Sequence, residues 1–196
     1  MHIGLIGGVG PAATDAYYRG LIAKSAARGR PLELTIAHAD AREMVANLAA
    51  QRPDLQAAIF VRLIGRLKAA GAEAAAVTSM GGHFCIREVE AKSPLPIVNL
   101  LPALDAAIAA RKLRKVGLIG TRTAMDSRAY VEMAVPGRVT PAQREVFFAA
   151  GRALVARGAE AVILGGTDLC LAFDGADCGF ATIDCIDVHV DALVQI

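Results

Sequence analysis

The stretch GAEAVILGGTD, residues 158–168, repeats a pattern that the chain also carries as GAEAAAVTS at residues 71–79. Each copy leads from glycine through a short apolar run into small polar residues. Such a run is typical of a strand that is buried on both faces of a parallel sheet. The repeat therefore predicts two similar α/β halves, each with this strand as its third.

Strands and helices alternate along the first half. Pro11 and Pro53 stand where a first helical residue would be, and Asp40 can cap a helix. We expect strands at residues 2–7, 32–38, 74–77 and 95–98, and helices at 11–27, 41–50, 53–71 and 83–90. Alternation at this spacing indicates βαβ units and a parallel sheet.

The pattern restarts in the second half, where residues 117–120 repeat the GLIG of residues 4–7. Thr140 and Gln143 have the spacing of a capping box, which opens a helix that ends at Gly158. Besides the second GAEA strand, we expect helices at 102–113 and from 188 onward, and strands at 115–120 and 181–184. The expected lobes are residues 1–100, completed by a C-terminal helix at 187–196, and residues 101–186.

The second half is shorter than the first by about 26 residues. Gly4 and Gly71 lie 67 positions apart, whereas the corresponding Gly117 and Gly158 lie 41 apart. The counterpart of the second strand is what the second half lacks. Either that edge strand has been lost, or a segment near residues 128–130 is missing from the printed sequence, and we favour the second explanation.

The composition indicates a folded globular protein. Of the 196 residues, 55% are hydrophobic, and the formal net charge of +2 gives no reason to expect nucleic acid or an anionic membrane as a partner. No apolar run reaches the ~18 residues of a membrane span, and no signal-type segment opens the chain. We therefore expect a soluble, cytoplasmic protein.

The four cysteines form no CxxC pair, so neither a zinc knuckle nor a thioredoxin-type motif is indicated. Cys170, Cys178, Cys185 and His189 match no standard metal spacing, and buried free cysteine is the commoner case. We expect no metal site.

Ligands of open parallel sheets bind at the carboxyl ends of the strands. The loops there are Gly7–Gly10, Ser79–His83, Thr121–Thr123 and Gly166–Asp168, and two similar halves would set them on opposite walls of one cleft. Gly8–Ala13 also fits the G-x-G-x-x-A fingerprint of dinucleotide binding, and Asp40 could reach a ribose. Because the match is short and GLIG recurs in the second half, we do not expect a dinucleotide.

The motifs together resemble the aspartate/glutamate racemase superfamily. GLIGGVGPAATDAYY at 4–18, GTRTAM at 120–125, the second GAEA motif and DCIDVHVDAL at 184–193 are similar to family motifs in the same order. The resemblance covers nearly the whole chain. It implies two flavodoxin-like lobes related by pseudo-twofold symmetry, an active-site cleft between them, no cofactor, and a homodimer. The family also carries an extra segment where this chain is short.

The resemblance implies proton transfer at a carbon next to a carboxylate. In the family, one cysteine after each third strand, in CNTxH and GCTE/D motifs, serves as base or acid, and thiols can be tuned for both roles. Here Ser79 and Gly166 stand at the two cysteine positions. Met80 and Gly81 replace the Asn and Thr that hold the substrate carboxylate. Two-thiol racemisation is therefore not expected.

The remaining family positions define the candidate site. If the protein is catalytic, we expect Ser79, activated by a neighbour such as His83, to act with Asp168 or His189 as the second proton carrier. A hydrogen-bonded structural role for each histidine, and a turn cap for Asp168, remain equally open. The expected substrate-binding residues are Gly8, Val9, Gly10, Thr14, Met80, Gly81, Thr121, Thr123, Gly166 and Thr167.

Three functions follow from these observations. The first is cofactor-independent proton transfer at the α-carbon of a small amino acid or carboxylate. The second is a non-catalytic carboxylate-binding relative that has lost the two thiols. The third is a related decarboxylase or isomerase, since the superfamily includes enzymes of those types that use a single cysteine.

Overall fold

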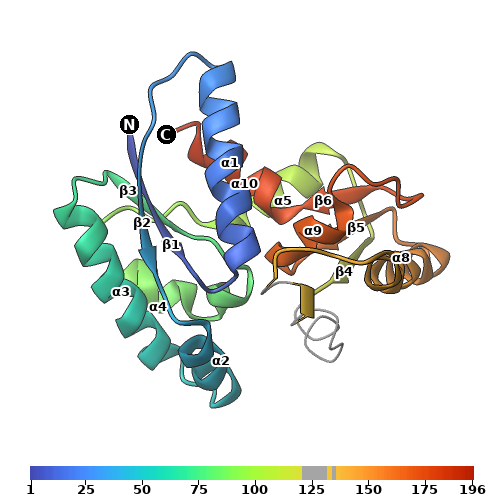
Figure 1. Cartoon of the computed structure of the whole chain (residues 1–196), viewed down its shortest axis with the longest axis horizontal. Helices are drawn as coiled ribbons and strands as arrows, with labels where there is room; N and C mark the ends of the chain where they lie inside the picture. The colour runs from blue at the N-terminus through green and yellow to red at the C-terminus, as the bar shows by residue number, and fades with distance from the viewer. Residues whose placement is uncertain (121–131, 134–135) are drawn as a thin grey trace.

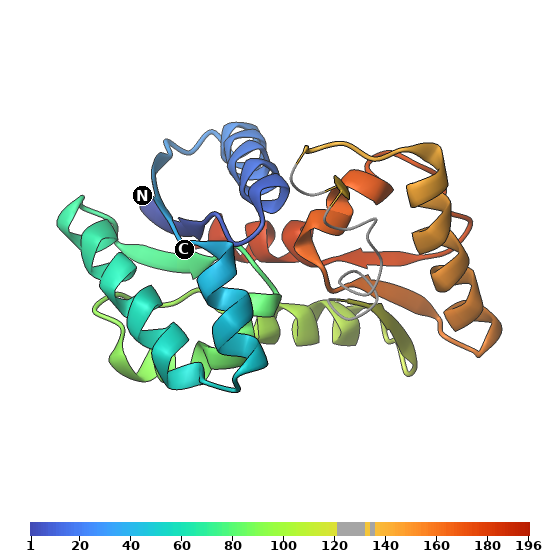
Figure 2. The same ribbon diagram turned by 60° about the horizontal axis from the view of Figure 1, so that its bottom comes forward.

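The computed structural model describes residues 1–120, 132–133 and 136–196, and folds into two α/β lobes. The described residues form two three-stranded parallel sheets with the orders β2-β1-β3 and β4-β5-β6. We call the part built on the first sheet the first lobe and the part built on the second sheet the second lobe. Figures 1 and 2 show the lobes side by side, with α1 at their junction.

The first lobe is centred on β1 (His2–Gly7), which pairs with β2 (Glu33–His38) and β3 (Ala74–Val77). The strand predicted at residues 95–98 is reduced to an isolated bridge between Ala75 and Ile97. Pro96 explains this outcome, because proline has no N–H to donate to a ladder. Its carbonyl still accepts from the Ala75 amide at 2.9 Å.

The helices of the first lobe begin where local sequence signals predict. Pro11 and Pro53 are the first residues of their helices, and the Asp40 carboxylate accepts from the Arg42 amide at 2.7 Å. The single helix predicted at residues 83–90 is instead a 3₁₀ turn followed by an α-helix. The elements are α1 (Pro11–Ala27), α2 (Ala41–Ala49), α3 (Pro53–Ala69), η1 (Gly81–Cys85) and α4 (Ile86–Lys92).

The second lobe contains β4 (Val116–Ile119), β5 (Ala161–Leu164) and β6 (Thr182–Asp184). The capping box of Thr140 and Gln143 is confirmed. Two helices begin earlier than predicted, because Asn99 and Asp184 cap them through the amides two residues on. The helical elements from residue 100 onward are α5 (Leu100–Ala110), α8 (Pro141–Ala156), η2 (Thr167–Leu169), α9 (Cys170–Phe173) and α10 (Cys185–Leu193).

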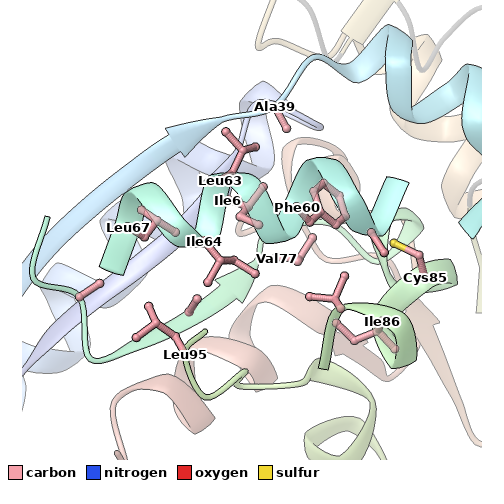
Figure 3. Packing of buried hydrophobic residues seen from close by; sticks show 14 residues of the cluster. Ile6, Ala39, Phe60, Leu63, Ile64, Leu67, Val77, Cys85, Ile86 and Leu95 are labelled. Carbon is pink, nitrogen blue, oxygen red and sulfur yellow. The ribbon is translucent and has the colours of Figure 1, made fainter. Parts of the chain in front are cut away.

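Alternate side chains of the first sheet enter two cores, as strand geometry requires. Ile6 and Val77 point to the face covered by α3 and α4, where Phe60, Leu63 and Ile64 complete the cluster drawn in Figure 3. Ile3, Leu5 and Ala76 point to the opposite face, where they meet side chains of α1 and α10.

Helix α10 ties the C-terminal end of the chain to the first lobe. Its Ile186, Val190 and Leu193 lie in the same cluster as Tyr17 and Leu21 of α1. Figure 1 accordingly shows α10 beside α1, with both chain ends on the same lobe. Cys185, the first residue of α10, packs instead with Leu100, Leu104 and other buried residues on the α5 side of the second sheet.

The second sheet is also covered on both faces. Val162 and Leu164 of β5 pack with Phe147 of α8, whereas Ile163 packs with Leu100 and Leu104 of α5.

No helix in the described part of the chain is long and apolar enough to cross a membrane. The segment at 128–130, where we predicted a missing stretch, lies outside the described residues.

Candidate active site

The candidate site is built from loops that follow strands β1, β3 and β5. Gly8–Gly10 follow β1, Ser79 lies two residues after β3, and Gly166–Asp168 follow β5. Hydrogen bonds between the lobes connect the β5 loop to the first turn of α1 and to Thr78, which follows β3. Thr121 and Thr123, predicted to bind substrate, lie outside the described residues.

Thr14 fixes the glycine loop after β1. Its hydroxyl donates to the Gly10 carbonyl at 2.9 Å and accepts from the Gly8 amide at 3.0 Å. Gly8 has φ +89°, a conformation that favours glycine, and an added Cβ there would lie 2.4 Å from Nδ1 of His38. Thr14 therefore shapes this loop through its own hydrogen bonds.

Asp168 reaches from the second lobe to the start of α1. Its Oδ1 accepts from the Ala13 amide at 2.8 Å, and the residue is only 2% exposed. Asp168 is therefore close to Gly10 and Ala13 in space, although it lies more than 150 positions away in sequence.

Thr167 makes a second contact between the lobes. Its hydroxyl donates to the carbonyl of Thr78 at 3.4 Å, a long hydrogen bond. The Thr78 hydroxyl in turn donates to the Ile6 carbonyl at 2.9 Å. The predicted ligand-binding hydroxyl of Thr167 thus lies at the lobe junction and is almost fully buried.

Ser79 and His83 are brought together by the 3₁₀ turn that follows β3. Nδ1 of His83 lies 2.7 Å from the Ser79 carbonyl, which can only accept, so Nδ1 carries the proton. The hydroxyl oxygen of Ser79 accepts from the Gly82 amide at 3.3 Å. The hydrogen bond between the two residues therefore involves the backbone of Ser79 and not its hydroxyl.

The other ring nitrogen of His83 is buried without a hydrogen-bond partner among the described residues. Since Nδ1 holds the proton of the neutral ring, Nε2 carries a lone pair. Burial lowers the pKa of His83, because the charged imidazolium would lose its hydration. The ring is thus a neutral, unpaired acceptor.

His189 is held by two partners. Its Nε2 donates to the Val98 carbonyl at 2.8 Å, and the Tyr17 hydroxyl donates to Nδ1 at 2.7 Å. Burial lowers the pKa of His189 to about 4, and the nearby His83 adds to that shift. The two imidazole rings lie 6.1 Å apart between centroids. Both nitrogens of His189 are therefore occupied, and its side chain is fully buried.

The remaining predicted residues differ in what surrounds them. Met80 packs against the second-lobe cluster of Leu100 and Ile163, and Val9 packs against the core beneath α3. Gly81 opens the 3₁₀ turn. At Gly166 an added Cβ would meet Leu169 at 3.4 Å, an ordinary contact, so a Cβ fits at this position.

Three of the four cysteines do not provide a thiol base in place of the two substituted positions. Burial raises the pKa of Cys85, Cys170 and Cys185 to about 12. Such thiols are protonated at neutral pH. Within the described ranges, no group of three or more His, Cys, Asp or Glu side chains could hold a metal ion.

A cavity of about 610 Å³ lies elsewhere, between α1, α9, β6 and α10. Charged side chains line it, among them Asp15, Arg19, Arg111 and Asp184. None of the predicted site residues belongs to its lining. It is therefore separate from the loops described above.

Sequence reasoning missed Tyr17 and Val98 as partners of His189. Tyr17 lies in the stretch GLIGGVGPAATDAYY, but nothing along the chain links it to a histidine 172 positions away. Its regular spacing with Ala13 and Leu21 on α1 indicated only that it is a core residue. The carbonyl of Val98 has no side-chain signal at all.

A model of the family described as Asp/Glu/Hydantoin racemase matches residues 6–135 and 126–193 of this chain. No protein with a curated description matches it in sequence.

Solved structures with the same two-lobed fold cover almost the whole chain. An Asp/Glu racemase candidate from Yersinia pestis is 22% identical, with a TM-score of 0.77 over 99% of this chain and 97% of that one. An aspartate racemase homologue from Pyrococcus horikoshii is 25% identical, with a TM-score of 0.71 over the same shares. Glutamate racemase from Thermus thermophilus is 23% identical, with a TM-score of 0.60 over 98% and 78%.

Proposed function

Because this chain belongs to the Asp/Glu/hydantoin racemase family, we propose that it moves a proton at the α-carbon of a small amino acid or related carboxylate, without a cofactor. The similarity to an aspartate racemase homologue supports this substrate class. The loops after β1, β3 and β5 are the proposed binding site, since ligands of parallel sheets bind at the carboxyl ends of strands.

The observation that carries this proposal is the unpaired Nε2 of His83. A buried nitrogen without a partner costs roughly 1–3 kcal/mol, so a ligand group that reaches it gains that energy. A neutral imidazole with a lone pair is also a competent general base at pH 7. In this proposal His83 removes the α-proton, and the bond from Nδ1 to the Ser79 carbonyl fixes the tautomer.

Ser79 has a supporting role in the proposal. Its hydroxyl oxygen accepts from the Gly82 amide, which leaves the hydroxyl hydrogen available to donate to a substrate carboxylate. A carboxylate that receives hydrogen bonds stabilises the negative charge that develops when its α-proton leaves.

A second candidate function, a carboxylate-binding protein without catalysis, is favoured by Gly166. The family uses two proton carriers on opposite faces of the substrate, and glycine has no side chain to serve as one. Both nitrogens of His189 and one carboxylate oxygen of Asp168 are already hydrogen-bonded. A protein that has lost the second proton carrier can no longer invert the α-carbon, but it can still bind the carboxylate.

The test is α-proton exchange in D2O, followed by NMR, with each enantiomer of aspartate and glutamate and a panel of other amino acids. We expect exchange by the wild-type protein, reduced by a factor of about 10² or more in His83→Ala. Exchange without inversion would fit a single base, and exchange with inversion would require a second carrier. No exchange with any substrate, together with ligand binding by calorimetry, would overturn catalysis and leave the binding protein.

Variants that restore the two thiols provide a second test, with a matched control. A Cβ at position 166 makes only an ordinary contact, and we expect the pair Ser79→Cys and Gly166→Cys to fold. Gly65→Cys adds a thiol on α3 at a point with nothing within 4 Å, outside the proposed site. Inversion that appears in the double variant and not in Gly65→Cys would show that the site has the geometry of a two-base racemase.

A further inference from the structure

Helix α1 begins without a cap of its own. Its N-cap residue is Gly10, which has no side chain to offer, and the first turn contains no acidic residue. A helix of 17 residues leaves unpaired amides and a partial positive charge at this end. An acceptor from elsewhere in the molecule is therefore needed.

Asp168 supplies that acceptor from the second lobe. Its carboxylate accepts from the amide of Ala13, the third residue of α1, at 2.8 Å. This is the bond that an N-cap side chain normally makes. Here the capping side chain comes from η2, which follows β5, and so belongs to the other lobe.

Gly10 and Asp168 fit each other. An added Cβ at Gly10 would lie 2.4 Å from Oδ2 and 2.8 Å from Oδ1 of Asp168. The φ of Gly10 is −137°, which any residue can adopt. Glycine is thus needed at position 10 to admit the carboxylate, and not for its backbone conformation.

We propose that Asp168 is a positioning residue that caps α1 from the opposite lobe and so sets the two walls of the candidate site in register. Because the bond joins the first turn of α1, which follows the loop after β1, to η2, which follows β5, it fixes the distance between the two walls. The second bond between these walls, from Thr167 to Thr78, is long at 3.4 Å and weaker. This inference does not depend on the proposed reaction, since a binding protein would need the same register.

The first test measures hydrogen exchange of the α1 amides and the melting temperature. In Asp168→Ala we expect the Ala13 amide to exchange at least about tenfold faster and the melting temperature to fall by roughly 2–8 °C. Asp168→Asn keeps an oxygen acceptor, so its Ala13 amide exchange and its melting temperature should stay close to those of the wild type. Asp174→Ala removes an exposed aspartate of the same lobe and is the matched control.

The second test uses the close contact between Gly10 and the Asp168 carboxylate. Gly10→Ala should lower the melting temperature in the wild type, because its Cβ displaces the carboxylate, but should have little effect when Asp168 is already alanine. Additive effects of the two substitutions would overturn the proposed pairing. So would unchanged exchange at Ala13 in Asp168→Ala, or loss of the cap in Asp168→Asn as complete as in Asp168→Ala.

Both readouts are independent of the substrate, so they separate this inference from the proposed function. If Asp168 is a proton carrier, Asp168→Asn should lose α-proton exchange with D2O as fully as Asp168→Ala does. If Asp168 is a positioning residue, Asp168→Asn should retain this exchange, with any loss mainly in substrate affinity.

Discussion

Burial decides the chemistry of the individual cysteine side chains. Cys85 and Cys185 are fully buried, and Cys170 is half-buried beside Asp168 and Asp184, whose charges further disfavour a thiolate. The pKa of each of these three thiols is raised to about 12. A thiol that stays protonated is a poor base, so these cysteines do not replace the ones that the family places after its third strands.

Thiol labelling of the native protein at pH 8 tests this conclusion. We expect Cys85, Cys170 and Cys185 to react with a disulfide reagent roughly a thousandfold more slowly than the same residues in denaturant, because the reactive thiolate is rare. Mass spectrometry of the labelled peptides identifies each site. Rapid modification of native Cys170 would contradict its burial and make it a candidate base.

At the scale of elements, the two GLIG segments share a packing reason for their first glycine. An added Cβ at Gly4 would lie 2.9 Å from the side chain of Leu67 on α3. At Gly117 it would lie 2.9 Å from Leu154 on α8. In each lobe, the glycine lets a leucine of the covering helix approach the first strand closely. The first glycine of the repeated motif is therefore explained by helix–sheet contact.

Gly117→Ala should lower the free energy of unfolding by about 1–3 kcal/mol, the usual cost of adding a methyl group to a packed core. Gly65→Ala is the matched control, because Gly65 lies on α3 with nothing within 4 Å. There alanine should stabilise the helix by roughly 0.5–1 kcal/mol. Urea unfolding of both variants measures the difference, and equal effects would contradict the packing explanation.

At the scale of the whole molecule, stability depends on histidines that are buried in the neutral form. His189 of α10 joins Tyr17 of α1 to the Val98 carbonyl just before α5. Its pKa is lowered to about 4 in the folded protein, mainly by burial, against ~6.5 for an unfolded histidine. The unfolded chain therefore binds this proton first as the pH falls.

The contribution of His189 is fully present above pH ~6.5 and is lost as the pH falls toward 4. Between pH 7 and pH 5 the free energy of unfolding should drop by about 2 kcal/mol from this residue alone. Burial lowers the pKa of His83 as well, so its contribution has the same sign. Urea unfolding at both pH values measures the drop.

Two variants test whether His189 causes this drop in the free energy of unfolding. His189→Asn removes the titrating ring and should reduce the difference between pH 7 and pH 5, even if the variant is less stable at both. His38→Gln replaces an exposed histidine and controls for the loss of any histidine. An unchanged pH difference in His189→Asn would contradict the assignment.

The sequence by itself determined the elements and their class. The GAEA strands, the capping box at Thr140 and the prolines at positions 11 and 53 act through neighbours along the chain, so local patterns reveal them. Local signals misplaced elements where neighbouring residues favour different structures. Pro96 reduced a predicted strand to a bridge, and Asn99 started α5 earlier than its apolar pattern indicated.

The motifs also predicted the family and which loops would form the candidate site, because parallel strands bring their carboxyl ends to one edge of a sheet. Only the tertiary structure decided what the side chains in those loops contact. Asp168 caps a helix of the other lobe, and His189 has both nitrogens occupied by partners distant in sequence. The physical reason is that a hydrogen bond between distant residues depends on how elements far apart in the chain pack against each other, and no local pattern reveals that geometry.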